Sequence, residues 1–406
     1  MATTRLVVDS IFSDRISDVP RSFIREILKV ALQPSMISFA GGLPNPVFFP
    51  QDELIAATFS VYTQKGRDIF QYSNSEGDPE LRAMIAARYR QRGLDIDADQ
   101  VLITSGSQQG LDLLAKTLLN EGDGLVIEEP GYLGAIQAFS IFRPDFIRVP
   151  VSGNGMNMEV LSEAMKRQPK LIYAVPNFQN PSGITYNDSN RRAIAGLLNS
   201  GSTYFIEDDP YGELRFRGEQ QTSMWQLAPE NTILLGSFSK VVVPGFRIGW
   251  LVAPAHLQEK LIIAKQATDL HTCQFTQNII LQYLRDHDLD NHIAKIVEAY
   301  GHQCQTMLDA IDQHFPPGVQ CTDPEGGMFL WAHLPDSMSA LALFDVAVEQ
   351  GVVFVPGDPF YIDQTGLNTM RLSFSTLDED TIRTGIEKLG NAIRLLDESS
   401  AKARLP

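Results

Sequence analysis

The middle of this chain alternates short apolar runs with segments of helical periodicity, and that alternation limits the folds it can adopt. The apolar runs lie at 101–104, 124–128, 170–175, 203–207, 233–237 and 248–252. Between the first two, Leu111, Leu114, Ala115 and Leu118 recur with helical spacing. Strands that are apolar on both faces and alternate with helices are typical of a mostly parallel sheet that is covered on both sides. The sequence therefore predicts an α/β fold.

The pattern changes from about residue 290. A long helical stretch at 291–315 is followed by strand-like runs at 326–331, 352–355 and 369–374, and then by a helix from Asp378. At 406 residues the chain can form two domains, because single cores stop growing at about 250–300 residues. We expect a large domain over 51–290 and a smaller α+β domain over 291–406. Residues 1–50 are expected to form an N-terminal arm that packs against the smaller domain or a neighbouring subunit, with 38–44 as a loop rather than a core element.

Composition narrows the class of protein. The formal net charge of −16 argues against nucleic acid or an anionic membrane as partner, although acidity that serves solubility explains it equally well. Cys273, Cys304 and Cys321 are odd in number and far apart, which indicates free thiols. The histidines lack metal-ligand spacing, so we expect no metal. No apolar run reaches 18 residues and the first ten residues lack a signal-peptide core, so we expect a cytoplasmic protein.

Polar motifs follow the ends of the predicted strands. Ligands bind at the carboxyl ends of the strands in sheets of this kind. The residues found at these ends are Ser107, Tyr132, Asn180, Asp208 and Lys240. We expect them to meet in one site.

The segment from Ser237 to Lys240 indicates which ligand binds there. Lys240 follows the hydroxyls of Ser237 and Ser239, and Arg247 comes seven residues later. This set suits pyridoxal phosphate, because the amine can form an imine with the cofactor aldehyde while the hydroxyls and the guanidinium bind its phosphate. A lysine with apolar neighbours that merely reaches solvent is the alternative.

Asp208 ends an apolar strand, where a carboxylate is costly unless it is paired. A pyridinium nitrogen would be a suitable partner, and the protonated ring would act as an electron sink. Tyr211 could then hydrogen-bond the phenolic oxygen of the cofactor. The alternative is that Asp208 caps the segment that follows.

The other motif residues are open to two interpretations. Ser107 and Gln108 begin a helix, whose free N–H groups could bind the phosphate, or Ser107 could simply cap that helix. Asn180 could donate to the phenolic oxygen, or it could belong to an ordinary Asn-Pro turn. Tyr132 could stack on the cofactor ring or be a half-buried core residue.

These residues resemble a known family. The chain is similar to the class I/II aminotransferases, pyridoxal-phosphate enzymes of fold type I, and most similar to the branch with 2-aminoadipate and kynurenine aminotransferases. The resemblance covers nearly the whole chain, and its motifs, among them 25–28, 39–44 and 371–374, occur in the family's order.

The resemblance implies a role for each motif residue. Lys240 would carry the cofactor and remove the substrate α-proton, with Asp208 and Tyr211 as the other catalytic residues. Tyr72 would reach the phosphate of a neighbouring subunit, which implies a homodimer with shared sites. The cofactor contacts would come from Tyr72, Ser107, Gln108, Tyr132, Asn180, Asp208, Tyr211, Ser237, Ser239, Lys240 and Arg247. The substrate contacts would come from Arg25, Gly42, Asn180 and Arg371.

The implied activity is transfer of an amino group from a 2-aminoadipate, aromatic or aliphatic donor to a 2-oxo acid, commonly 2-oxoglutarate, in a ping-pong cycle. Arg371 would grip the substrate α-carboxylate, unless it is only a surface strand residue. Arg25 would meet a distal substrate carboxylate, unless it is a solvated arginine. A β-lyase or decarboxylase reaction stays open, as does a non-catalytic cofactor-binding domain. A DNA-binding regulator would need an N-terminal module, and we expect the 24 residues before Arg25 to be too few for one.

Overall fold

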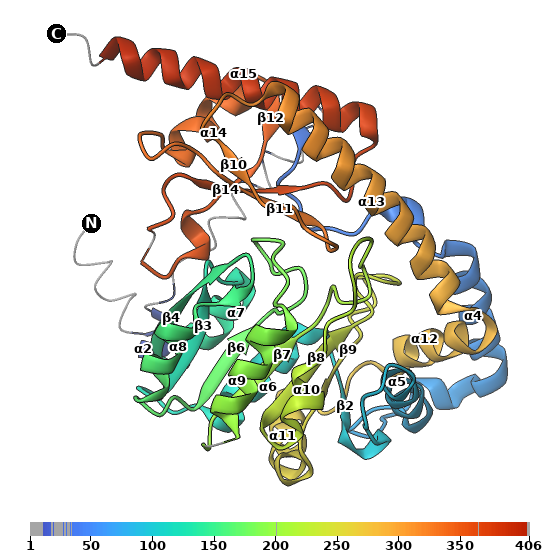
Figure 1. Ribbon diagram of the computed structural model, residues 1–406. Coiled ribbons are helices and arrows are strands. Elements are labelled where there is room, and N and C mark those ends of the chain that lie inside the picture. The colour runs from blue at the N-terminus through green and yellow to red at the C-terminus, as the bar shows by residue number, and fades with distance from the viewer. Residues whose placement is uncertain are drawn as a thin grey trace.

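The computed structural model describes residues 11–17, 19, 27, 30, 33, 35–199, 201–363 and 365–403. Within them, two sheets face each other across the middle of the molecule, a larger one built from 101–252 and a smaller one built from 320–373 (Figure 1). Arg25, one of the predicted substrate contacts, lies outside the described residues.

The described part of the larger sheet has eight strands in the order β2-β9-β8-β7-β6-β3-β4-β5. The bounds are β2 (Val101–Thr104), β3 (Gly124–Glu129), β4 (Asp145–Ser152), β5 (Gly155–Met156), β6 (Leu171–Ala174), β7 (Tyr204–Asp208), β8 (Thr232–Ser237) and β9 (Gly249–Val252). Strands β4, β3, β6, β7 and β8 run parallel, whereas β9 is antiparallel to both β8 and β2. The α/β prediction is confirmed, with an antiparallel strand inserted near one edge.

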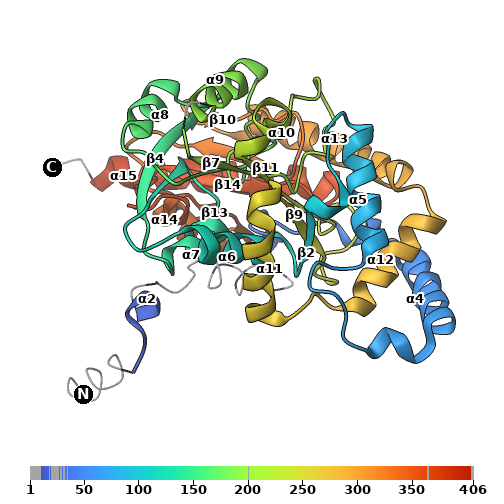
Figure 2. The same ribbon diagram turned by 90° about the horizontal axis from the view of Figure 1, so that it is seen from below.

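Helices cover both faces of this sheet (Figure 2). One face carries α6 (Ser107–Leu118), α7 (Leu133–Ser140) and α11 (Ala255–Asp269), and the other carries α8 (Met158–Met165), α9 (Asp188–Leu198) and α10 (Met224–Leu227). Because both faces are covered, the central strands β6 and β8 are buried at every position. A strand that is buried throughout explains why its sequence reads as a continuous apolar run.

The smaller sheet has the order β10-β11-β14-β13 and is antiparallel. Its strands are β10 (Gln320–Cys321), β11 (Phe329–His333), β13 (Val355–Pro356) and β14 (Thr369–Ser373). The helices α13 (Leu289–His314), α14 (Ala340–Glu349) and α15 (Glu379–Ala403) accompany it (Figure 1). A third group of helices, α4 (Gln51–Lys65), α5 (Pro79–Gln91) and α12 (Gln274–Asp286), lies beyond β2.

Three details of the sequence prediction were wrong. The segment 38–44 was expected to be a loop rather than a core element. Residues 39–44 do form a loop, but Ser38 belongs to β1 (Ile37–Ser38), which pairs with β12 (Val352–Val353), and Phe39 and Ala40 are fully buried. The run 352–355 forms two strands in different sheets, because β12 pairs with β1 and β13 pairs with β14.

The third concerns the strand expected from Gly326, which begins only at Phe329. A Cβ on Gly326 would lie 2.3 Å from the Phe178 ring, and Gly327 has a positive φ of 77°. This stretch is therefore a close approach between the two halves of the chain rather than a strand. The domain bounds at residues 50 and 290 stay a prediction.

No helix within the described residues is long and apolar enough to cross a membrane.

Candidate active site

A cavity opens where the carboxyl ends of β3, β6, β7 and β8 face the smaller sheet. The predicted site residues that line it are Gly42, Ser107, Gln108, Tyr132, Asn180, Asp208, Tyr211, Ser237, Ser239, Lys240, Arg247 and Arg371. The five residues expected from the strand ends, Ser107, Tyr132, Asn180, Asp208 and Lys240, are thus found in one cavity. Tyr72 is not among the lining residues, and Arg25 lies outside the described residues.

Lys240 lies after β8 with its amine inside the cavity. Its Nζ donates to the carbonyl oxygen of Gly42 at 2.9 Å. Burial, and to a lesser extent the charges of Arg371 and Arg247, lowers the pKa of Lys240 to about 8. The amine is hydrogen-bonded to a neutral carbonyl rather than paired with a carboxylate, so a useful fraction of it is uncharged near neutral pH.

Asp208 is the last residue of β7 and is only 2% exposed. Its Oδ2 accepts a hydrogen bond from the Tyr173 hydroxyl at 2.7 Å, whereas its buried Oδ1 has no hydrogen-bond partner among the described residues. Burial raises its pKa to about 7, the Tyr173 bond lowers it, and the charge of Asp209 raises it. Oδ2 is therefore bound to Tyr173 and does not cap the segment that follows Asp208. Oδ1 can accept a hydrogen bond from a cationic or N–H group in the cavity.

The phosphate-binding residues predicted from the sequence form one cradle. The Ser237 hydroxyl donates to Ser239 Oγ at 2.8 Å, and Arg247 Nη1 reaches the same oxygen at 3.4 Å. Helix α6 begins at Ser107, and its N-cap is Gly106 without a side-chain cap, so Ser107 does not cap it. Gly106 has a φ of 80°, and a Cβ there would lie 2.1 Å from Arg247 Nη2. Only glycine lets the guanidinium lie against the N-terminus of α6.

Asn180 lies in a turn that the side chain of Gln179 holds in place. Gln179 donates to Pro130 O at 2.7 Å, and its side-chain oxygen accepts from Ser182 N at 2.8 Å. In this turn, Asn180 Nδ2 donates to the Tyr211 hydroxyl at 3.3 Å, and Asn180 Oδ1 accepts from Arg371 at 2.9 Å. Asn180 therefore belongs to a turn and also lines the cavity, and its donation to a phenolic oxygen of the cofactor stays a prediction.

Arg371 comes from the middle of β14 and is 5% exposed, so it is not a surface residue. Its Nη2 donates to Ala40 O at 2.8 Å, and the guanidinium lies 4.4 Å from the Phe329 ring centroid. Its buried Nε has no partner among the described residues. Burial lowers its pKa to about 10, which leaves it charged at neutral pH. It is a cation that faces the cavity, and the hydrogen bonds it makes within the described part of the chain go to an amide and a carbonyl oxygen.

Tyr132 and Gln108 close one side of the cavity. Tyr132 is partly buried against the main core and lines the cavity, so both interpretations of it are compatible with the structure. Gln108 uses its amide to donate to Gly134 O at 2.7 Å. A Cβ on Gly134 would lie 2.5 Å from the Tyr132 ring, so glycine there lets the ring lie close to the start of α7.

Tyr72 lies outside this cavity and is 77% exposed. Its ring makes an edge contact with His271, with centroids 5.9 Å apart. Within a single chain, Tyr72 does not reach the predicted cofactor cradle.

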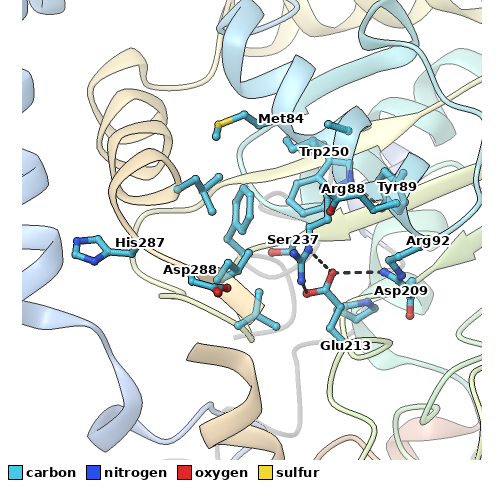
Figure 3. Close-up of a pocket in the computed structure, with 18 residues that line it drawn as sticks. Met84, Arg88, Tyr89, Arg92, Asp209, Glu213, Ser237, Trp250, His287 and Asp288 are labelled. Atoms are coloured by element: carbon cyan, nitrogen blue, oxygen red, sulfur yellow. Dashed lines mark hydrogen bonds and ion pairs between the residues drawn. The ribbon is translucent and has the colours of Figure 1, made fainter. Parts of the chain in front are cut away.

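A second cavity lies behind Ser237 and Phe238, between α5 and the junction of α12 with α13 (Figure 3). Three of the charged side chains that line it, Arg88, Arg92 and Glu213, pair with one another, and Asp290 lies beside them. Arg88 forms two hydrogen bonds with Glu213, at 2.8 and 2.9 Å, and one with Asp290 at 2.6 Å, while Arg92 lies 3.4 Å from Glu213. Although burial opposes it, the hydrogen bonds and charges of Glu213 and Asp290 raise the pKa of Arg88.

Tyr173 and Phe329 are among the residues at the predicted site that the sequence analysis missed. Tyr173, in the middle of β6, holds Asp208, and Phe329, in β11, lies under Arg371. A signal for Tyr173 existed, because a tyrosine in a strand buried on both faces needs a partner for its hydroxyl. Nothing in the sequence indicated which partner that would be.

Comparisons with known proteins agree with this geometry. The family model for aminotransferase class I and II matches residues 48–389. An aromatic-amino-acid aminotransferase of Thermococcus litoralis is 39% identical, with 94% of each chain covered. A 2-aminoadipate transaminase of Thermus thermophilus is 40% identical, covering 93% of this chain and 94% of the relative.

A solved structure is also similar over its whole length. It is an alpha-aminoadipate aminotransferase from Thermus thermophilus, complexed with N-(5'-phosphopyridoxyl)-L-leucine. It superposes with a TM-score of 0.90 at 38% identity, covering 97% of this chain and 99% of the other.

Proposed function

This chain belongs to the class I and II aminotransferases and is a pyridoxal-phosphate-dependent enzyme of fold type I, and we propose that the cavity around Lys240 is its active site. One observation carries this assignment. A buried carboxylate oxygen without a partner among the described residues, on Asp208, shares a cavity with a lysine of lowered pKa. A protonated ring nitrogen and an aldehyde are groups that would complement these two side chains.

The residues present fit pyridoxal phosphate. Asp208 Oδ1 would accept from the ring nitrogen, and Tyr211 and Asn180 would bind the phenolic oxygen. Ser107, Gln108, Ser237, Ser239 and Arg247 would hold the phosphate at the N-terminus of α6, and Tyr132 would cover the ring. When bound, the cofactor supplies an aldehyde that takes up the amino group and a ring that accepts electrons from the substrate α-carbon.

The chain's own residues supply binding and proton transfer. Arg371 would grip the substrate α-carboxylate with the guanidinium edge that its contacts to Ala40 and Asn180 leave available. Lys240, whose amine is partly neutral near pH 8, would remove the proton from the substrate α-carbon and later return it. The absence of a side chain at Gly42 leaves room for Phe329 and Arg371, because a Cβ there would lie 2.9 Å from the Phe329 ring.

The substrates are proposed from the relatives. Their names cover an acidic donor, 2-aminoadipate, and aromatic donors, and the solved relative holds a leucine adduct. We therefore propose acidic, aromatic and aliphatic amino acids as donors and 2-oxoglutarate as acceptor. The acceptor would bind only after the first 2-oxo acid has left the same site, in a ping-pong cycle.

A donor panel tests this function. Purified enzyme is mixed with each amino acid in the presence and absence of 2-oxoglutarate, and both 2-oxo acid and glutamate are quantified. We expect equal amounts of the two products, and parallel double-reciprocal plots for a ping-pong cycle. Formation of pyruvate with ammonia, or of an amine with carbon dioxide, would instead identify a β-lyase or a decarboxylase.

We further propose a homodimer in which Tyr72 completes the partner's phosphate site. Tyr72 follows by two residues Phe70, one of several exposed apolar side chains, and exposed apolar patches mark interfaces. These side chains include Ile55, Phe59, Tyr62 and Phe70, which are 59%, 72%, 55% and 65% exposed. The rings of Tyr62 and Phe70 make an edge contact, with centroids 5.7 Å apart.

Subunit mixing tests the shared site. Lys240→Ala and Tyr72→Ala chains, each weakly active alone, are unfolded together, refolded and assayed. Activity that recovers in the mixture supports the shared site, because a hybrid dimer contains one site with both residues intact. A fully active monomer in sedimentation would contradict it.

We place the enzyme in the cytoplasm, since Cys273, Cys304 and Cys321 are all free thiols.

A further inference from the structure

We propose that Tyr173 is a positioning residue that orients the Asp208 carboxylate toward the cofactor ring and holds it in its charged form. The inference rests on the proposed role of Asp208. The Tyr173 hydroxyl donates to Asp208 Oδ2 at 2.7 Å, and both side chains are buried, at 0% and 2% exposure. Asp208 Oδ1, the oxygen that Tyr173 does not contact, is the one that lacks a partner among the described residues.

The sheet register brings the two side chains together. Strands β6 and β7 are parallel neighbours in which Tyr173 pairs with Ile206, two residues before Asp208. Residues two apart on a strand share a face, so the Tyr173 ring and the Asp208 carboxylate lie on the same side of the sheet. The ring is fixed from that side by Phe139 of α7, with centroids 5.7 Å apart and an interplanar angle of 65°.

This contact does two things to the carboxylate. It fixes the rotation of the group, because one oxygen is bound and the other must then face the cavity. It also favours the charged form, since a phenol that donates to a carboxylate stabilises its negative charge. Tyr173 keeps its proton throughout the working range, because burial and the nearby Asp208 charge raise its pKa well above the ordinary value.

The other titratable groups around Asp208 make no hydrogen bond to it within the described residues. Asp209, which follows it, raises its pKa. The remaining titratable and charged groups that face it from the packed elements are Glu128 from β3, Tyr132 at the start of α7, Tyr211 after β7, Lys240 after β8, Arg247 before β9 and Arg371 from β14. The hydrogen bond from Tyr173 is thus the contact within the described residues that lowers the Asp208 pKa and so favours the charged carboxylate.

The test is Tyr173→Phe, with Tyr186→Phe as a matched control. Phenylalanine keeps the ring that packs on Phe139 and removes only the hydroxyl. Tyr186 is also fully buried, and its hydroxyl donates to a buried carboxylate, Glu128, at the same 2.7 Å. Glu128 also accepts from Val175 N and Gln179 Nε2, each at 3.1 Å, and does not line the active-site cavity. Both variants therefore lose one equivalent hydrogen bond.

The readouts are the dissociation constant of the cofactor as a function of pH, the pH profile of kcat/KM, and the unfolding temperature. We expect the two variants to lose similar thermal stability. In Tyr173→Phe alone, the cofactor should bind about tenfold more weakly at pH 7, because a charge-assisted hydrogen bond is lost. The Asp208 pKa rises when the donor is removed, so the acidic limb of both profiles should move upward by about one pH unit.

Tyr173→Phe is then combined with Asp208→Asn. If Tyr173 acts through Asp208, it should add little to the loss in that background. A Tyr173→Phe enzyme that matches Tyr186→Phe in cofactor affinity and pH profile would overturn the inference while the proposed function stands. If Asp208→Asn itself retains cofactor affinity and activity within about threefold of the wild type, the proposed role of Asp208 fails instead.

Discussion

The two cavities on either side of the Ser237–Phe238 segment differ in how their buried charges are satisfied. Behind the segment, Arg88 and Arg92 share Glu213 (Figure 3). Asp290 adds a second partner for Arg88. In front of it, Asp208 and Arg371 each keep a buried atom without a partner among the described residues, and Lys240 is bonded only to a neutral carbonyl in that part of the chain. Charged groups that pair with one another stabilise the fold, whereas buried charged groups with unsatisfied atoms can bind a ligand. This difference distinguishes the proposed active site from the second cavity.

The largest effect is expected for Lys240→Ala. The variant should lose transamination by about 10⁴-fold or more, because the amine that transfers the α-proton is gone. Single-turnover rates measure this loss, and borohydride reduction of the wild-type enzyme should attach the cofactor to the peptide that contains Lys240. Lys265→Met is the matched control, since Lys265 is a buried lysine already bonded to Asp269, Gln109 and Thr272. A comparable loss in both variants would break the contrast between paired and unpaired amines.

Asp208→Asn should reduce the rate by about 10²-fold or more, on the order of 3 kcal/mol in the barrier, because the amide cannot keep the ring nitrogen protonated. The circular-dichroism spectrum should not change. Asp209→Asn, in which the neighbouring carboxylate is removed, serves as the control. If Asp209→Asn is the slower enzyme, the assignment of the ring partner is wrong.

Arg371→Lys should raise KM for amino acids by about tenfold to a hundredfold, because an ammonium cannot grip the α-carboxylate with two parallel hydrogen bonds. Steady-state kinetics measure this change. A comparison of each amino acid with the corresponding amine, which lacks the carboxylate, sharpens the test. Equal losses for both compounds would show that Arg371 shapes the cavity rather than binding the carboxylate.

The unpaired amine should also give the cofactor-free protein a pH-dependent stability. The pKa of Lys240 is about 8 in the folded protein, against about 10.4 in an unfolded chain. Between these values the unfolded state binds more protons, so stability rises with pH, by at most about 1.4 kcal/mol per pH unit. Urea denaturation from pH 8 to 10.5 should show this slope in the wild type and a smaller one in Lys240→Met. Identical slopes would indicate that Lys240 is not buried as a partly neutral amine.

The smallest effect on activity is expected for Glu213→Gln in the second cavity. It should lower the free energy of unfolding by about 1–3 kcal/mol, because Arg88 and Arg92 lose their shared carboxylate. The value of kcat should stay within about twofold of the wild type, since Glu213, Arg88 and Arg92 do not line the cavity around Lys240. A loss of activity as large as that of Arg371→Lys would mean that the two cavities work together.

Local patterns predicted much of this molecule. The apolar runs gave β2, β3, β6, β7, β8 and β9 to within one residue or two, because a strand buried on both faces needs continuous apolar sequence. The same local rules failed at Gly326 and at 38–44, where contacts with distant parts of the chain decided the structure. Strand β4 was missed although its residues alternate between buried and exposed.

The sequence alone determined the fold class and the central residues of the candidate site, because Ser107, Tyr132, Asn180, Asp208 and Lys240 lie at or after the ends of strands, and parallel strands bring their carboxyl ends to one edge. Only the tertiary structure decided which other residues bind and orient these side chains. The bond from Tyr173 to Asp208 depends on the register of β6 and β7, and the contacts of Arg371 with Ala40 and Asn180 join positions as many as 331 residues apart. Such contacts arise from packing between elements, which no local pattern of residues encodes.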